Sequence, residues 1–180
     1  MADYREVITF WFEEASPKQW FAKDPEFDNA VTQRFAELHA RAARCELFPW
    51  RQAAAGRLAE IIVLDQFSRN MFRDRPQAFA CDALALALAQ EAVAHGVDQA
   101  LPAKQRAFLY MPYMHSESAV IQARAVELFK APGLEDNYKF ALQHKAIIDR
   151  FGRYPHRNAI LGRESSDEER TFLQSPGAGF

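Results

Sequence analysis

The stretch "GRLAEIIVLDQFSRNMF", residues 56–72, decides the fold of this chain of 180 residues. Its apolar residues recur at steps of three and four, the spacing that places side chains on one face of an α-helix. That face carries Leu58, Ile61, Ile62, Asp65 and Arg69. We therefore predict one helix over about residues 53–72, buried on the face that also holds a carboxylate.

The same helical spacing continues along the chain, with no period-two alternation typical of strands. Capping residues, prolines and glycines divide it into helices. The predicted ranges are about 4–14, 25–44, 53–72, 78–94, 102–110 (ended by Pro112), 116–130 (capped by Ser116), 135–151, 155–162, and from Ser166 onward. We predict a single all-α domain over residues 1–180 with eight or nine antiparallel helices. The short connections fit a bundle or a tetratricopeptide-like superhelical stack, although no clean 34-residue repeat is present.

The composition argues against several classes of partner. Lys and Arg number 22 against 24 Asp and Glu, a formal net charge of −2, so no nucleic-acid or membrane partner is expected. The N-terminus has the wrong charge pattern for a secretion signal, and no apolar run approaches about 20 residues. Cys45 and Cys81 lie far apart without a CxxC pattern, which favours free thiols. We expect a soluble, cytoplasmic protein.

Polar residues occupy several positions that helical spacing assigns to the core. Asp65 is costly there unless paired, and Arg69 is one turn away, so the two form either an internal ion pair or part of a site. His144 lies in an apolar stripe of the helix over 135–151, where histidines commonly bond to backbone. His115 and Glu117 follow in "MPYMHSES", residues 111–118, at a helix start where side chains can converge.

The segment "FGRYPHRNAILGRES", residues 151–165, concentrates arginines around a predicted helix start. Free backbone N–H groups of a first helical turn attract anions, and guanidinium groups suit carboxylate or phosphate. Arg157, with Arg153 and Arg163 nearby, therefore predicts an anion pocket. The alternative is that these arginines cap helix ends and pair with the protein's own carboxylates, such as Glu164 or the C-terminus of Phe180.

Several long motifs resemble those of a bacterial family known as domain of unknown function 924. They include "LDQFSRNMFR", "RAFLYMPYMHSES" and "RFGRYPHRNAILGRESSDEE". Ser68 and Tyr154 stand where the family usually has proline and phenylalanine, and the ending Gly-Ala-Gly-Phe differs from a Gly-Ser-Ser-Phe type. The resemblance implies a helical fold near the tetratricopeptide-like superhelices and no assigned activity. It also implies that the tail, residues 174–180, docks, whereas its composition alone predicts a frayed end.

We predict that the three polar motifs converge on one pocket that binds a small anionic or polar metabolite. The candidate catalytic residues are Asp65, His115, Glu117 and His144, and the candidate ligand-binding residues are Arg69, Asn70, Arg153, His156, Arg157, Asn158 and Arg163. Whether the protein is an enzyme is left open. If it is one, His115 or His144 serves as general acid or base, oriented by Glu117 or Asp65, in hydrolase- or lyase-type chemistry.

Other chemistries are less well supported by the sequence. Several candidates could ligate a metal, but no metal-binding spacing fixes them, so no metal is predicted, and the sequence identifies no cofactor. The alternative function is a non-catalytic interaction module that holds a peptide or partner helix. Exposed Trp11, Trp20 and Trp50 would favour it. Self-association through an apolar face is also an open expectation.

Overall fold

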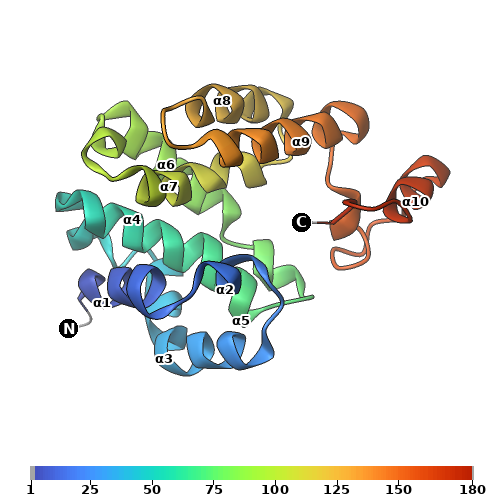
Figure 1. Ribbon diagram of the computed structural model, residues 1–180. Coiled ribbons are helices and arrows are strands. Elements are labelled where there is room, and N and C mark those ends of the chain that lie inside the picture. The colour runs from blue at the N-terminus through green and yellow to red at the C-terminus, as the bar shows by residue number, and fades with distance from the viewer. Residues whose placement is uncertain (1–2, 180) are drawn as a thin grey trace.

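A continuous central helix forms from the stretch over residues 54–71 in the computed structural model, which describes residues 3–179 (Figure 1). It consists of α4 (Ala54–Ile62), a π-helical turn (Val63–Phe67) and α5 (Ser68–Met71). Between residues 58 and 68 every side chain is buried, which explains why the stretch is apolar on most of its circumference. Helices α1, α6 and α7 pack against α4.

The N-terminal half lies on one side of this central helix. Helix α1 (Tyr4–Thr9) continues into a π-helical turn (Phe10–Glu14), and α2 (Pro17–Phe21) and α3 (Pro25–Ala43) follow. Asp24 caps α3 by accepting hydrogen bonds from two backbone N–H groups. Four apolar residues of α3 that recur at steps of three and four are buried: Phe27, Val31, Phe35 and Leu38. The helix packs against α5. The predicted start of this helix is therefore confirmed.

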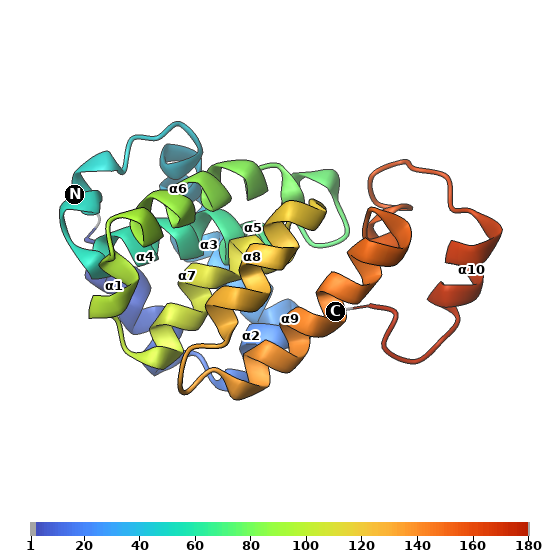
Figure 2. The same ribbon diagram turned by 90° about the horizontal axis from the view of Figure 1, so that it is seen from above.

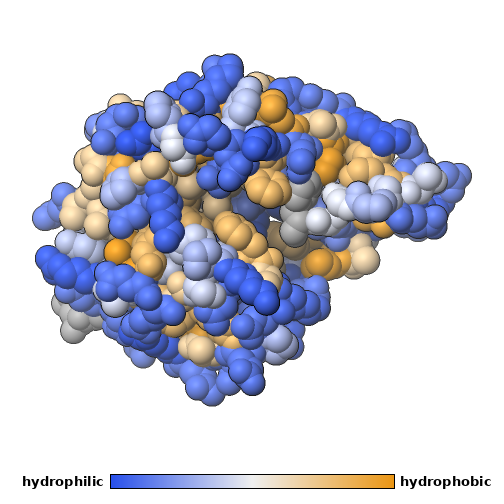
Figure 3. All heavy atoms as spheres, viewed as in Figure 1, coloured by the Kyte–Doolittle hydropathy of each residue, from blue (hydrophilic) through white to orange (hydrophobic). Residues whose placement is uncertain are grey.

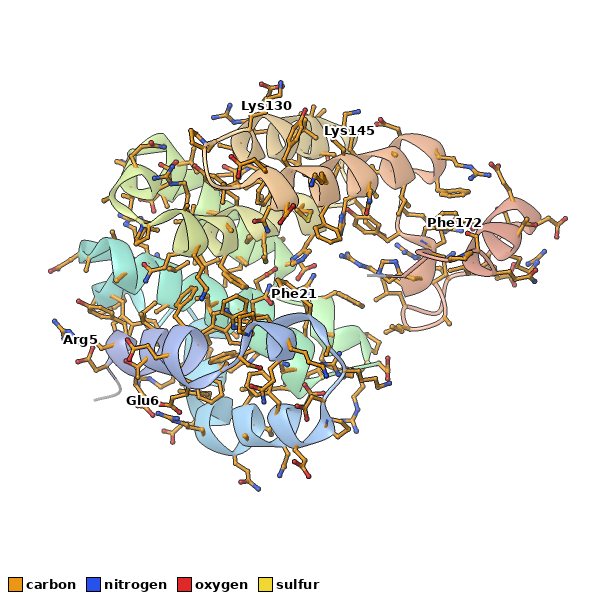
Figure 4. All side chains as sticks on the ribbon, in the orientation of Figure 1. Arg5, Glu6, Phe21, Lys130, Lys145 and Phe172 are labelled. Atoms are coloured by element: carbon orange, nitrogen blue, oxygen red, sulfur yellow. The ribbon has the colours of Figure 1, made fainter. Side chains whose placement is uncertain are left out.

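The second half forms successive hairpins on the other side of α4, as seen from above in Figure 2. These helices are α6 (Asp82–Ala94), α7 (Ala103–His115), α8 (Ala119–Phe129) and α9 (Glu135–Phe151). Short 3-10 turns connect the chain at Phe48–Gln52, Pro76–Phe79, Val97–Ala100 and Pro155–Arg157. Lys130 and Lys145 mark the outer side of the α8–α9 pair, away from α1 to α5 (Figure 4).

The C-terminal segment stands apart from these layers. Gly152, with φ of 70°, ends α9 in the left-handed region. Helix α10 (Asp167–Leu173) begins with a capping box formed by Ser166 and Glu169. It packs near the Pro155–Arg157 turn, and a small cluster of Ile147, Ile148, Tyr154, Phe151 and Phe172 joins the segment to α9. The surface is notched between this segment and the main body (Figure 3).

The all-α prediction is confirmed, and residues 3–179 contain no strand. Ten α-helical segments occur in that range, and α4 and α5 belong to one helix, in agreement with eight or nine. No helix within it is both long and apolar enough to cross a membrane. The tetratricopeptide-like order of the stack stays a prediction.

Four predicted helix boundaries are wrong. The helix predicted over residues 155–162 is only a 3-10 turn at Pro155–Arg157. The helix predicted from residue 78 begins at Asp82, after a separate 3-10 turn at Pro76–Phe79. Helix α7 continues through Pro112 to His115, because residues 107–114 are all buried and their packing outweighs the backbone bond that proline removes. Ser118, not Ser116, caps α8. In the tail, Ala178 is buried, but Phe180 lies outside the described residues, so docking of the tail stays a prediction.

Candidate functional site

Asp65 lies at the centre of the π-helical turn and is fully buried. Its Oδ1 is 2.7 Å from Nδ1 of His115 and 3.3 Å from Nη1 of Arg69, and its Oδ2 accepts a 2.6 Å hydrogen bond from Gln66. Burial alone would raise the pKa of this carboxyl, but His115 and Arg69 outweigh burial and hold the pKa below its usual value. Asp65 is therefore ionised and fixes the His115 ring.

Arg69 extends this cluster to α6. Its two terminal nitrogens donate to both oxygens of Asp82, at 2.8 and 3.0 Å, and one also donates to the backbone carbonyl of Asp65. Arg69 therefore forms the internal ion pair with Asp65 that the sequence offered as one of two alternatives, and it also pairs with Asp82. Sequence reasoning missed Asp82, because an acidic residue in the first turn of a helix is ordinarily explained by the helix dipole.

Arg157 is held differently from Arg69. Its side chain is only 8% exposed and lies against the rings of Phe79 and Tyr154, with 4.5 and 4.7 Å from Cζ to the ring centroids. Nη2 donates to the carbonyl of His115, Asp82 is 3.7 Å from Nη1, and Nε has no hydrogen-bond partner. Burial, and then the charge of Arg69, lower the pKa of Arg157. This guanidinium is incompletely satisfied by the protein itself.

A cleft of about 420 Å³ opens beside Arg157, in the size range of small-molecule sites. We call it the Phe79 cleft. Its polar lining comprises Asp82, His115, Ser116, Glu117 and Arg157, and its apolar lining comprises Pro76, Phe79, Ala80, Ala83, Leu86, Pro112 and Leu161. The His115 ring is partly exposed here. Within residues 3–179, its Nε2 makes no hydrogen bond.

Glu117 ties the third motif to the second. It forms a bidentate pair with Arg163, at 2.8 and 2.9 Å, and accepts a 2.7 Å hydrogen bond from the backbone N–H of Tyr154. Although burial alone would raise the pKa of Glu117, these hydrogen bonds lower it. Asn158 accepts from Arg163 Nε and donates to Ser165. These groups hold the C-terminal segment on the body of the molecule.

The two remaining candidate histidines lie on either side of Tyr154 rather than in the cleft lining. His144 bonds through Nδ1 to the carbonyl of Phe140 at 2.7 Å, the backbone contact typical of a core histidine. Burial lowers the pKa of His144 to about 3 and that of His156 to about 4. Both rings are therefore neutral near pH 7.

Two candidates lie away from the cleft. Asn70 donates to Asp28 of α3 at 2.8 Å, and Arg153 forms a bidentate pair with Glu169 of α10 at 2.7 and 2.9 Å. The structure thus brings together Asp65, Arg69, His115, Glu117, Arg157, Asn158 and Arg163 in one network, but not Asn70 or Arg153. Arg153 and Arg163 form bidentate pairs with internal carboxylates, as the alternative for that segment anticipated, whereas Arg157 makes only a longer contact of 3.7 Å to Asp82.

Two further observations concern the metal-site and interaction-module hypotheses. Within residues 3–179, no three His, Cys, Asp or Glu side chains group as metal ligands. Trp11 is fully buried, and Trp20 and Trp50 pack partly buried against the core. The three tryptophans therefore form no exposed patch of the kind that would favour an interaction module.

The fold belongs to a recognised class of helical bacterial proteins. Residues 7–177 match the family described as bacterial protein of unknown function (DUF924), and the chain belongs to that family. It is similar to the solved structure of a protein of unknown function from Agrobacterium tumefaciens, at 42% identity and a TM-score of 0.90. The match covers 95% of this chain and 96% of that one. Among proteins of curated function, none matches.

Proposed function

We propose that the protein binds a small anionic metabolite in the Phe79 cleft through Arg157. The observation that supports this most is the incomplete pairing of a buried guanidinium. Arg157 carries a positive charge, lies nine-tenths buried, and retains an Nε with no partner. A buried charge of this kind costs folding free energy unless a ligand completes its hydrogen bonds. Arg69, Arg153 and Arg163 have bidentate carboxylates and need no ligand.

Chemistry at the bound molecule is supported by a second observation, the Asp65–His115 pair. A carboxylate on Nδ1 fixes the ring tautomer and leaves Nε2 to take up or give a proton, the arrangement used by general acids and bases. Of the histidines considered, His115 suits this role best, because His144 bonds to backbone and does not line the cleft. Hydrolase- or lyase-type chemistry on a ligand held by Arg157 would use His115, with Asp65 as the positioning residue.

A thermal-shift titration tests the binding proposal. The purified protein is titrated with acetate, hexanoate, phosphate and sulfate, in parallel with Arg157→Gln and Arg153→Gln. An anion at about a hundred times its Kd stabilises the folded state by about 2.7 kcal/mol, which is readily seen as a rise in Tm. We expect Arg157→Gln to abolish the shift. Arg153→Gln is the matched control, because it breaks an ion pair outside the cleft and should retain it.

Retention of the shift in Arg157→Gln would mean that the anions act on the protein surface in general and not at Arg157. If no anion stabilises the native protein, the binding proposal is wrong, and the interaction-module alternative becomes the better explanation of the fold.

A further inference from the structure

The ionised groups around the Phe79 cleft compensate one another. Three carboxylates, Asp65, Asp82 and Glu117, are matched by three guanidinium groups. These belong to Arg69, Arg157 and Arg163. With a neutral His115 ring, the network carries no net charge. An anion placed beside Arg157 would therefore leave one excess negative charge in a partly buried site, which is unfavourable unless a proton accompanies it.

His115 is the group best placed to take up that proton. Its Nδ1 already contacts the ionised carboxylate of Asp65, which stabilises an imidazolium ring, and the residue lines the cleft. The charged and titratable groups facing His115 come from every neighbouring element. They are Asp65 and Arg69 of the central helix, Asp82 of α6 and Glu117 before α8 in the same cleft, His144 of α9, and Arg157. Tyr154, His156 and Arg163 of the C-terminal segment belong to the surrounding network through Glu117 and Tyr154.

The other two histidines of this group are poor proton acceptors. Burial holds the pKa of His144 at about 3 and that of His156 at about 4. Both rings stay neutral over the range in which an ordinary histidine titrates. The proton that accompanies an anion near pH 7 therefore goes to His115.

The lining of the cleft also restricts the anion. Asp82 and Glu117 face the same space as Arg157, so a second negative charge on the ligand would be repelled. Most of the remaining wall is apolar, with Phe79, Leu86 and Leu161 available to cover a hydrocarbon group. A monoanion with an apolar body can contact both Arg157 and the apolar wall. A phosphate dianion would bring a second negative charge near Asp82 and Glu117, and it has no apolar body to cover the wall.

We propose that the Phe79 cleft binds a small monocarboxylate with an apolar body and takes up one proton on His115 as it does so. This inference rests on the proposed function and adds the ligand class and its pH dependence. The ligand carboxylate accepts hydrogen bonds from Arg157, and the proton passes from solvent to Nε2 of His115. Affinity consequently increases as the pH falls through the titration range of His115, because binding favours the protonated ring.

The test uses hexanoate as the probe, with hexan-1-ol as the neutral counterpart and inorganic phosphate as the dianion. Histidine ring resonances are followed by NMR across pH, with and without saturating hexanoate. His115→Gln identifies the resonance of His115 and removes the proton acceptor. His95→Gln is the matched control, since His95 is exposed on the loop after α6 and bonds to the backbone of Glu91. The Kd of hexanoate is measured for all three proteins.

We expect hexanoate to shift protonation of the His115 ring to higher pH, as a nearby opposite charge does. By linkage the Kd of hexanoate should fall about tenfold from the alkaline to the acid end of the pH series. His115→Gln should bind hexanoate with a Kd that no longer changes over this range, and His95→Gln should behave as the native protein. Hexan-1-ol should show no pH dependence, and phosphate should bind more weakly than hexanoate.

Two results would overturn this inference while leaving anion binding intact: hexanoate binding with an unchanged pKa of His115, or a pH dependence that persists in His115→Gln. Binding of phosphate without binding of hexanoate would overturn the assigned ligand class alone. If no anion binds at all, the failure belongs to the proposed function.

Discussion

At the scale of single residues, Asp65, Arg69, Asp82 and His115 form one group because segments distant in sequence meet there. Asp65 and His144 could be recognised because helical spacing places each among apolar neighbours. Their partners depend on which helices meet, and residues 65, 82 and 115 come together only through packing of α4, α6 and α7. Asp82 was missed, and Asn70 and Arg153 proved to face α3 and α10, because sequence spacing does not reveal the direction of a side chain between elements.

Replacing Arg157 or Arg69 by methionine keeps much of the side-chain volume, but the two changes should affect the free energy of unfolding differently. In Arg157→Met the carboxylate of Asp82 keeps its two bonds from Arg69, and an unpartnered Nε is removed. We expect the free energy of unfolding to stay within about 1 kcal/mol of the native value while anion binding is lost. Urea unfolding and the thermal-shift titration measure the two effects.

Arg69→Met provides the matched contrast. It leaves the buried Asp65 and its neighbour Asp82 without their guanidinium partner, which should cost about 3 kcal/mol or more. An Arg157→Met variant destabilised as strongly as Arg69→Met would show that Arg157 is needed for folding, and would contradict its assignment to a ligand.

At the scale of elements, caps and apolar periodicity predicted where most helices begin and end, and burial explains the exceptions. Pro112 was expected to end a helix because it lacks an N–H, yet α7 passes through it within the core. The π-helical turn at residues 63–67 was not predictable from periodicity, because the surrounding residues are buried on all sides of the helix. Such turns are frequent at functional sites, and this one carries Asp65.

Gly56 in α4 gives a test of packing against intrinsic helix preference. A Cβ at this position would lie 2.1 Å from the carbonyl oxygen of Trp50, so the neighbouring 3-10 turn would have to move. Helix propensity alone predicts that Gly56→Ala stabilises by up to about 1 kcal/mol, whereas overpacking costs about 1–3 kcal/mol. We expect a lower Tm, measured by circular dichroism. The variant Ala55→Gly measures the effect of helix propensity in the same turn. A Gly56→Ala variant more stable than the native protein would contradict the close approach of residue 56 to the Trp50 carbonyl.

At the scale of the whole molecule, the C-terminal segment is joined to the body through groups whose protonation matters. The Tyr154 hydroxyl donates to the carbonyl of Met114 at 2.5 Å, and Glu117 holds Tyr154 and Arg163. His144 and His156 flank the same tyrosine, with ring centroids 5.7 and 5.5 Å away. The junction of body and segment therefore contains two histidines that folding keeps neutral.

The two histidines of this junction predict that the folded protein becomes less stable as the pH falls. Burial lowers the pKa of His144 to about 3 and of His156 to about 4, from an ordinary value of 6.5. Below pH 6.5 the unfolded chain binds protons that the folded chain does not, so the free energy of unfolding falls as the pH falls. At about 1.4 kcal/mol per pH unit for each ring, the loss reaches about 5 kcal/mol two units below that value.

Urea unfolding at a series of pH values measures this loss, and hydrogen exchange shows where the structure opens first. We expect residues 153–163 to lose protection before α4, because both rings adjoin Tyr154. His144→Phe keeps an aromatic ring against Tyr154 but removes one proton-binding site, so it should roughly halve the slope of stability against pH. His95→Gln, a change on an exposed ring, should leave the slope unchanged. An undiminished slope in His144→Phe would mean that acid acts through the carboxylates instead, whose lowered pKa values at Asp65 and Glu117 place their loss at lower pH.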